Sequence, residues 1–505
     1  MADPLILALD QGTTSTRAIL FDAKGAALAE SGRPLEQFYP ADGWVEHDAQ
    51  AIYAASVEVL RDVMRKTGRE PSEIAAIGIT NQRETVVVWD RVTGRPIHKA
   101  IVWQDRRTAA RCDQLRAGGH ETRVTEITGL LLDPYFSGTK IAWLLDNVEG
   151  ARARAEAGQL LAGTIDSWVI WKLTGGKVHA TDATNASRTL LFDIRKQAWS
   201  PEMGEMLNVP LWMMPQVLDC TGDFGETETA LLGRSIPIRG VAGDQQAALM
   251  GQGCIRPGEM KATYGTGCFM LINTGESAPV SKARLLTTVA ARVAGRTTFA
   301  LEGAIFVAGA AIQWMNEGLK ARGGPEGVEK LAIEARDDLG VVLVPAFTGL
   351  GAPWWDAGAR GAILGLTRDA GLPEIARAAF DASALQTRDL IEAMRADAPD
   401  AFRDPESGKA GAELRIDGGM SRSAWFSQRL ADLTGVCVGR ATYGETTALG
   451  AALFAGVGAG VYRDVEEAAA ARPETESYTP NMDALRCEAA YVRWLDAVAR
   501  VRSQA

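Results

Sequence analysis

Four short loops that combine glycine with acidic or hydroxyl side chains are the parts of this sequence best suited to chemistry. They are Asp10–Thr16 (DQGTTST), Val241–Ala248 (VAGDQQAA), Thr263–Cys268 (TYGTGC) and Ile416–Ser421 (IDGGMS). In the first loop, Gly12 permits close backbone approach, and the hydroxyls and N–H groups that follow suit anionic oxygens. The fourth loop follows an expected strand and precedes a helix, a natural position for phosphate or ribose. Each loop alone is better explained as an ordinary turn, but the four in this order favour a phosphate-handling site.

Several common kinds of functional site are excluded by the same sequence. No GxxxxGK[ST] segment occurs and no GxGxxG follows a strand, which excludes a P-loop and a dinucleotide-binding Rossmann site. The four histidines, at positions 47, 98, 120 and 179, include no pair spaced to bind a metal. A formal net charge of -10 argues against a nucleic-acid partner and against adsorption on an anionic membrane.

The N-terminal segment MADPLILALD lacks a basic region, and its apolar run ends at Asp10, which predicts a first strand and not a signal peptide. The six cysteines are scattered without a CxxC pair, as is typical of a reducing compartment. The longest charge-free stretch, Gly340–Trp355, is interrupted by Pro345, Pro353 and several glycines, so no membrane insertion is expected. The sequence therefore predicts a cytoplasmic protein.

Short apolar segments alternate with longer amphipathic ones along the 505 residues, a pattern typical of an α/β fold. We expect strands at 5–9, 17–22, 74–80, 85–90, 238–242, 261–264, 268–273 and 414–416. We expect helices at 140–145, 167–173, 308–320 and 373–395, and one capped by Asp48 that runs to about Thr67. Each half contains a strand hairpin whose tight turn carries Gly and Thr, which predicts domains of 1–250 and 251–505. The segment after about Pro473 is polar and weakly patterned, so we expect a terminal extension there.

The four loops together resemble those of the actin, Hsp70 and sugar-kinase ATPase superfamily. Tyr135–Asn147 (YFSGTKIAWLLDN) and Gly361–Ser383 (GAILGLTRDAGLPEIARAAFDAS) narrow this resemblance, because they are similar to the two signatures of the FGGY carbohydrate kinases. The resemblance implies two ribonuclease-H-like, actin-like ATPase domains that flank a nucleotide and substrate cleft. Within the family, blocks between residue 8 and about residue 454 resemble the members that act on glycerol. These blocks include ALDQGTTSTRAI, GWVEHD, AAIGITNQRET, IVWQDRRT, TDATNASRTLLF, GVAGDQQAALMGQ, TYGTGCFMLINTG and VPAFTGLGAPWWD.

The resemblance implies ATP-dependent phosphorylation of glycerol to sn-glycerol 3-phosphate, with Mg²⁺ as the metal. It assigns the glycerol hydroxyls to Arg83, Glu84, Tyr135, Asp244 and Gln245, and the glycerol carbons to Trp103 and Phe269. The residue types agree with this, because a guanidinium beside a carboxylate reads a diol well, and a strand end is where α/β proteins place ligands. Taken alone, Arg83 and Glu84 fit a solvated loop, and Trp103 and Phe269 fit ordinary core packing.

Asp244 is the candidate general base, because an attacking hydroxyl must lose its proton and a nearby carboxylate can orient it and accept that proton. Asp244 would also cap the helix expected to begin at Gln245, and both roles can coexist. The resemblance further places Asp10 in the outer shell of Mg²⁺, which water would link to the protein. It assigns the nucleotide to Thr13, Thr14, Ser15, Arg17, Thr266, Gly309, Gln313, Gly419 and Ser423.

Two positions depart from the pattern of bacterial family members. Ser423 stands where many have Asn, which predicts a modest change in nucleotide affinity. Ser235 stands where members regulated by fructose 1,6-bisphosphate carry Arg, so we do not expect that inhibition here. Dimers and tetramers are usual in the family, which implies a homodimer or homotetramer.

Two alternatives to glycerol phosphorylation stay open: a related kinase for a longer polyol or a ketose such as xylulose, and a non-catalytic relative. The aromatic residues Trp103, Tyr135 and Phe269 favour a three-carbon substrate, because bulky rings reduce the pocket. Retention of both Asp10 and Asp244 argues against a degenerate kinase.

Overall fold

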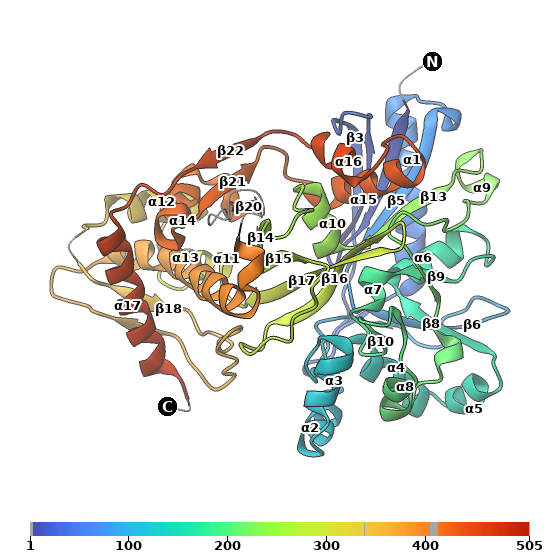
Figure 1. Cartoon of the computed structure of the whole chain (residues 1–505), viewed down its shortest axis with the longest axis horizontal. Helices are drawn as coiled ribbons and strands as arrows, with labels where there is room; N and C mark the ends of the chain where they lie inside the picture. Colours follow the sequence, from blue (N-terminus) through green and yellow to red (C-terminus); the bar gives the residue numbers. More distant parts are fainter. Residues whose placement is uncertain (1–3, 338, 404–412, 504–505) are drawn as a thin grey trace.

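Two β-sheets form the frame of the molecule, and each is built from one half of the chain (Figure 1). The computed structural model describes residues 4–337, 339–403 and 413–503. The first sheet has the order β13 (Ile238–Gly243), β5 (Ile74–Asn81), β1 (Leu5–Gln11), β2 (Ser15–Phe21) and β3 (Ala27–Pro34). The second has the order β16 (Leu286–Val293), β17 (Arg296–Ile305), β15 (Cys268–Gly275), β14 (Met260–Tyr264), β20 (Glu413–Gly418), β21 (Cys437–Ala441) and β22 (Thr475–Tyr478).

The same five-stranded core occurs in both sheets. In the first, β1 pairs antiparallel with β2 and parallel with β5, β2 pairs antiparallel with β3, and β5 pairs parallel with β13. In the second, β14, β15, β17, β20 and β21 repeat these pairings in the same order. The edge strands β16 and β22 extend the second copy. The α/β fold with two related cores that the sequence predicts is confirmed.

Helices from both halves of the chain cover the first sheet. Side chains of β1 alternate between its two faces, because successive residues of a strand point in opposite directions. Leu5, Leu7 and Leu9 pack with α1 (Ala49–Thr67), which Asp48 caps as expected. The residues between them pack with α15 (Thr446–Gly458), a helix of the second half. The second half therefore completes the core of the first, which a division at residue 250 does not anticipate.

The segment after residue 473 is part of the fold, and the expectation of a weakly patterned extension is wrong. Its strand β22 pairs with β21, and α17 (Ala484–Val501) packs on the second core. The Trp494 side chain is fully buried and its indole N–H donates to Asp389 Oδ2 at 2.8 Å. The pattern is hard to read because Trp494, Ala497 and Val498 alternate with charged residues that face away from the core.

The other expected helices occur as α4 (Ser137–Asn147), α6 (Ile165–Leu173), α11 (Gly309–Glu317) and α13 (Leu372–Asp397). A third sheet has the order β4 (Glu46–His47), β7 (Ala100–Ile101), β6 (Val86–Asp90) and β8 (Leu160–Thr164). In the described part of the chain, no helix is long and apolar enough to cross a membrane. The remaining elements are α2 (Ala109–Ala117), α3 (Glu121–Thr128), α5 (Ala151–Glu156), α7 (Ala183–Ala186), α8 (Pro201–Leu207), α9 (Thr229–Leu232), α10 (Asp244–Gly251), α12 (Gly324–Glu334), α14 (Ala424–Thr434), α16 (Val465–Ala470), β9 (Ala180–Asp182), β10 (Phe192–Asp193), β11 (Ala198–Trp199), β12 (Gln216–Leu218), β18 (Val342–Val344) and β19 (Ala362–Leu364).

Candidate active site

Strand register brings the predicted site residues of the first sheet to one edge. Gln11 at the end of β1 lies beside Asn81 at the end of β5, and Asn81 lies beside Gly243 at the end of β13. These three strands are parallel, so the loops that follow them leave the same edge of the sheet. The residues after these ends include Gly12–Ser15, Gln82–Glu84 and Asp244, which are far apart in the sequence.

Arg83 and Glu84 are buried between β5 and β6, with only 1% of each side chain exposed. The solvated-loop alternative for this pair is therefore wrong. The Glu84 backbone has a φ of 61°, in the left-handed region that costs a non-glycine residue about 1–2 kcal/mol. Strained backbone of this kind is concentrated at functional sites, which agrees with a ligand-binding role for this turn.

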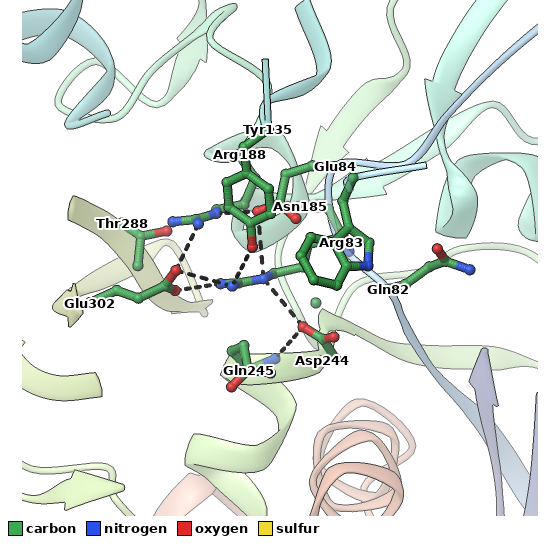
Figure 2. Close-up of polar contacts among 12 residues, drawn as sticks. Gln82, Arg83, Glu84, Tyr135, Asn185, Arg188, Asp244, Gln245, Thr288 and Glu302 are labelled. Carbon is green, nitrogen blue, oxygen red and sulfur yellow. Dashed lines mark hydrogen bonds and ion pairs between the residues drawn. The ribbon is translucent and has the colours of Figure 1, made fainter. Parts of the chain in front are cut away.

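Four buried charged side chains form a connected chain around Arg83 (Figure 2). Arg83 Nη1 lies 2.6 Å from Glu302 Oε2, and Arg83 Nη2 donates to Glu302 Oε1 at 3.1 Å. Arg188 Nη2 donates to Glu302 Oε1 at 2.8 Å, and Arg188 Nε donates to Glu84 Oε1 at 2.6 Å. Burial acts to raise the pKa of Glu302, but Arg188 and Arg83 lower it to about 2. Glu302 is therefore ionised and orders both arginines.

Asp244 is the first residue of α10, where it directly follows β13. Its Oδ1 accepts a hydrogen bond from the Gln245 backbone N–H at 2.7 Å and lies 3.2 Å from Arg83 Nε (Figure 2). The Asp244 side chain is 32% exposed, which leaves the carboxylate accessible to a ligand. Its partial burial raises the pKa of Asp244, while Arg83 and Lys261 oppose that rise. The carboxylate is thus a better proton acceptor than an ordinary Asp.

Gln245, the second residue of α10, is held by a lysine from the second sheet. Lys261 on β14 is fully buried, and its Nζ donates to Gln245 Oε1 and, at 3.1 Å, to Thr263 Oγ1. Burial lowers the pKa of Lys261, whereas Asp417 and Asp244 act to raise it. The sequence does not assign a role to Lys261, because a lone lysine in an apolar strand indicates neither its partner nor its ligand.

Three aromatic rings predicted for the substrate contact one another beside Arg83. The Trp103 and Tyr135 rings are 5.6 Å apart between centroids, and those of Trp103 and Phe269 are 6.4 Å apart, both edge to face. Each ring is only partly buried, so ordinary core packing does not account for them. Arg83 Nη2 donates to the Tyr135 hydroxyl at 3.4 Å, and Trp103 Nε1 donates to Thr13 Oγ1 at 2.9 Å. The rings therefore link the polar cluster to the first glycine loop.

The glycine turns fit close backbone approach. At Gly309, which begins α11, an added Cβ would lie 2.5 Å from the Gly265 carbonyl oxygen. Gly309 N–H donates to that oxygen at 3.0 Å, which fixes α11 against the turn between β14 and β15. At Gly418, where φ is 90°, an added Cβ would lie 2.4 Å from the Tyr264 carbonyl oxygen. At both positions a side chain would overlap a backbone oxygen, so the close approach requires glycine.

Asp10, at the end of β1, lies in an electrostatic environment that favours a cation. Burial, followed by the charges of Asp244 and Glu445, raises the pKa of Asp10 to about 7, and Arg17 only partly opposes this. A bound cation would relieve this repulsion between carboxylates. Within the described residues, no group of three or more His, Cys, Asp or Glu side chains is arranged to hold a metal ion. A metal here would depend on oxygens of a ligand and of water, as Mg²⁺ commonly does.

The other residues predicted for the nucleotide lie in turns, on strand β2 and on helices that flank the two sheets. In the first glycine turn, Gly12 N–H donates to the Ser15 carbonyl at 2.9 Å, and Thr14 is exposed. Arg17 Nη1 lies 2.6 Å from Glu445 Oε1, so this guanidinium already has an acidic partner. Thr266 is exposed in the turn after β14.

The residues predicted for the adenosine end make contacts of their own. Gln313, on the exposed side of α11, donates from Nε2 to Glu317 Oε1 at 2.9 Å. Gly419 is exposed after β20. Ser423 caps α14: its Oγ accepts from Phe426 N–H at 2.9 Å and donates to Glu329 Oε1 at 2.8 Å. The hydroxyl that replaces the family's Asn is thus engaged within the protein.

The repeated five-stranded core, its glycine turns and the polar cluster between the sheets define a two-domain kinase with an actin-like ATPase fold. The chain belongs to the FGGY family of carbohydrate kinases. Residues 5–251 match the N-terminal domain of that family, and residues 260–459 match its C-terminal domain. The family and fold predicted from the sequence are therefore confirmed.

Several relatives share most of this chain's length. It is 54% identical over 498 residues to the glycerol kinase of Alcanivorax borkumensis, covering 99% of this chain and 98% of that one. It is 53% identical over 500 residues to glycerol kinase 1 of Pseudomonas aeruginosa, covering 99% of both chains. The crystal structure of Plasmodium falciparum glycerol kinase with ADP superposes with a TM-score of 0.93 at 32% identity, covering 100% of this chain and 99% of that one. The gluconate kinase of Lactobacillus acidophilus, 21% identical over 100% of this chain and 99% of that one, shares the fold with a TM-score of 0.87.

Proposed function

We propose that the chain transfers the γ-phosphoryl group of ATP to glycerol, forming sn-glycerol 3-phosphate and ADP in glycerol uptake and catabolism. The observation that carries this proposal is the convergence of the buried Arg83–Glu84 pair, the accessible Asp244 carboxylate and three partly buried aromatic rings. Relatives named glycerol kinase, with more than half of their residues identical along the whole chain, support it.

The proposed glycerol site combines polar groups for three hydroxyls with an apolar wall for the carbon chain. Arg83 supplies donors and Glu84 acceptors, and Tyr135 and Gln245 add groups that both donate and accept. The C–H side of glycerol lies against the rings of Trp103 and Phe269, which are edge to face with 6.4 Å between centroids. Such closely packed rings favour a three-carbon substrate over xylulose or a longer polyol.

Asp244 acts as general base in this proposal. One hydroxyl oxygen of glycerol attacks the γ-phosphorus as its proton passes to the Asp244 carboxylate, and the bond from that phosphorus to the bridging oxygen of ADP breaks. The Gln245 N–H holds Asp244 Oδ1 at 2.7 Å, which fixes the carboxylate for this transfer. Orientation of the hydroxyl contributes alongside basicity, since even a raised carboxyl pKa remains far below that of an alcohol.

The nucleotide lies between the glycine turns of the two sheets in this proposal. Its phosphates contact Arg17, Thr266 and the loop of Thr13, Thr14 and Ser15, and its adenosine end contacts Gly309, Gln313, Gly419 and Ser423. Asp10 would hold Mg²⁺ through water, and the metal would neutralise charge at the phosphates. The raised pKa of Asp10 and the close contact of Gly309 with Gly265 support these assignments.

We also propose how the whole protein is divided into domains and how it assembles. The chain divides near residue 250 into residues 1–250, which carry most of the substrate site and the first phosphate loop, and residues 251–505, which complete the nucleotide site and contribute Phe269 to the substrate site. The two repeated sheets and the family matches at 5–251 and 260–459 support this division. The protein works in the cytoplasm as a homodimer or homotetramer, with glycerol and ATP as its ligands and without a nucleic-acid partner.

A coupled ADP-release assay with a panel of substrates tests the proposed function. Glycerol, xylitol, xylulose and gluconate are compared at equal concentrations with saturating Mg²⁺ and ATP. The highest kcat/KM is expected for glycerol, and the product is identified as sn-glycerol 3-phosphate. A higher kcat/KM for xylulose or gluconate, or no substrate-dependent ADP release, would overturn the proposal.

A further inference from the structure

We propose that Glu302 and Arg188 are positioning residues of the substrate site. They hold Arg83 and Glu84 in the geometry that reads the polyol, and they keep Arg83 from pairing fully with Asp244. This inference rests on the proposed function, because it assigns a role in the same substrate site to two side chains outside the predicted contact set.

The contacts form a closed circuit (Figure 2). Glu302 binds both terminal nitrogens of Arg83, at 2.6 and 3.1 Å, and also accepts from Arg188 at 2.8 Å. Arg188 in turn donates to Glu84 at 2.6 Å, and Glu84 is the next residue after Arg83 along the chain. Glu302 therefore holds Arg83, and Arg188 holds Glu84. Glu302 and Arg188 are in turn held by the hydrogen bond between them. A fork of two hydrogen bonds also sets the plane of the Arg83 guanidinium.

Stability alone does not explain why this circuit is buried. At most 1% of each side chain is exposed, so all four charges have lost nearly all contact with water. The attraction between buried ion pairs roughly offsets that loss of hydration, and apolar replacements are often neutral or stabilising. Setting the geometry of Arg83 and Glu84 explains why these four charges are buried, whereas a net gain in stability does not.

The position of Asp244 gives Glu302 a second effect. Arg83 directs Nη1 and Nη2 to Glu302, while its Nε lies 3.2 Å from Asp244 Oδ1 without forming a hydrogen bond of acceptable geometry. If Glu302 lost its charge, Asp244 would be the nearest accessible carboxylate for this guanidinium. A full Arg83–Asp244 pair would occupy the carboxylate that must accept the hydroxyl proton. By binding Nη1 and Nη2 of Arg83, Glu302 thus leaves the Asp244 carboxylate free for the substrate hydroxyl.

Glu302 also connects the two sheets at this point. It belongs to β17 of the second sheet, whereas Arg83, Glu84 and Arg188 belong to the first half of the chain (Figure 2). The positions of Arg83 and Glu84 in the polyol site therefore depend on how the two halves of the chain are placed relative to each other.

The test compares Glu302→Gln with the matched control Glu276→Gln. Glu276 lies just after β15 and pairs with Arg296 at 2.8 Å on the surface, so this control removes the same charge from an exposed ion pair. For Glu302→Gln we expect kcat/KM for glycerol to fall about tenfold or more, equivalent to about 1.4 kcal/mol, with contributions from both constants. KM for ATP should change by less than about twofold, because the nucleotide contacts are separate.

Conservative variants keep the test decisive if Glu302→Gln does not fold. Glu302→Asp retains the charge but shortens the side chain, and Arg188→Lys retains the charge but loses the fork. Both should fold and raise KM for glycerol by less than Glu302→Gln would. Wild-type constants in either of them, a Glu302→Gln enzyme that matches Glu276→Gln, or equal rises in KM for glycerol and ATP would each overturn the positioning role. If wild type itself shows no activity on glycerol, the proposed function has failed instead.

Discussion

Lys140 offers a direct physical test of the environment behind the substrate site. It lies on α4, its side chain is fully buried, and its Nζ donates to the Tyr135 carbonyl oxygen at 2.6 Å. Burial lowers the pKa of Lys140 from 10.5 to about 7, although Glu84, Asp105 and Asp133 oppose the change. The folded protein therefore binds this proton less tightly than the unfolded chain does.

The sign of the pH dependence follows from this difference. Between pH 7 and 10.5 the unfolded chain holds the Lys140 proton and the folded protein has released it, so the free energy of unfolding rises with pH. The slope approaches about 1.36 kcal/mol per pH unit, which gives about 2 kcal/mol between pH 7 and pH 9. Below pH 7 both states are protonated, and this contribution to stability is lost.

Lys140→Met removes the titrating amine while keeping a side chain of similar length. We expect urea unfolding at pH 7, 8 and 9 to show that wild type gains about 2 kcal/mol relative to the variant over this range. The lost hydrogen bond to the Tyr135 carbonyl adds a pH-independent offset of about 1 kcal/mol. Lys66→Met is the matched control, because Lys66 Nζ also donates to a backbone carbonyl but is exposed. Parallel curves of the free energy of unfolding against pH for wild type and Lys140→Met would show that folding does not lower the pKa of Lys140.

Two further predictions concern the nucleotide site and regulation. Gly309→Ala places a Cβ only 2.5 Å from the Gly265 carbonyl oxygen, so the turn beside α11 must shift. ADP affinity measured by calorimetry should therefore fall while glycerol affinity is kept. An unchanged ADP affinity would show that this turn does not contact the nucleotide. Fructose 1,6-bisphosphate should leave the rate unchanged, because Ser235 Oγ donates to Glu226 at 2.7 Å and supplies no positive charge. Strong inhibition in the coupled assay would show that another group binds the bisphosphate.

Local patterns in the sequence predict the strands and turns that carry the site. The apolar run of β1 and the glycine after it identify the first loop, and parallel strand register then places Asp244 at the same edge. The acid at the start of α10 and the diol-reading pair after β5 are recognisable because their neighbours in sequence are regular strands. These features depend on residues within one element or one turn.

Contacts between distant segments are not visible in such patterns. Glu302 is 219 residues from its partner Arg83, and it appears in the sequence only as a single acid within the apolar strand β17. A charged residue in an otherwise buried strand is a usable signal, since such groups are almost never fully buried without a partner. The signal gives no partner, however, because the pairing depends on how the two sheets are placed.

The packing of the last third of the chain illustrates the same limit. The helix α15 is apolar on nearly all sides, and its sequence does not indicate which sheet it covers. Its close approach to α10 depends on Gly450, where an added Cβ would lie 1.7 Å from the Ala247 carbonyl oxygen. The fold thus places a helix from the second half against the first sheet, a long-range choice that hydrophobic periodicity cannot specify.

The catalytic role of Asp244 is tested most directly by a coupled ADP-release assay with glycerol on wild type and Asp244→Asn, together with nucleotide binding by calorimetry. If Asp244 is the general base, kcat of Asp244→Asn falls by about 10²–10⁴, the usual contribution of such a group, while nucleotide affinity is retained. Asn preserves the size of the side chain and can still accept from the Gln245 N–H, so only proton acceptance and the negative charge are removed. Turnover of glycerol by Asp244→Asn at close to the wild-type rate would contradict a general-base role for Asp244.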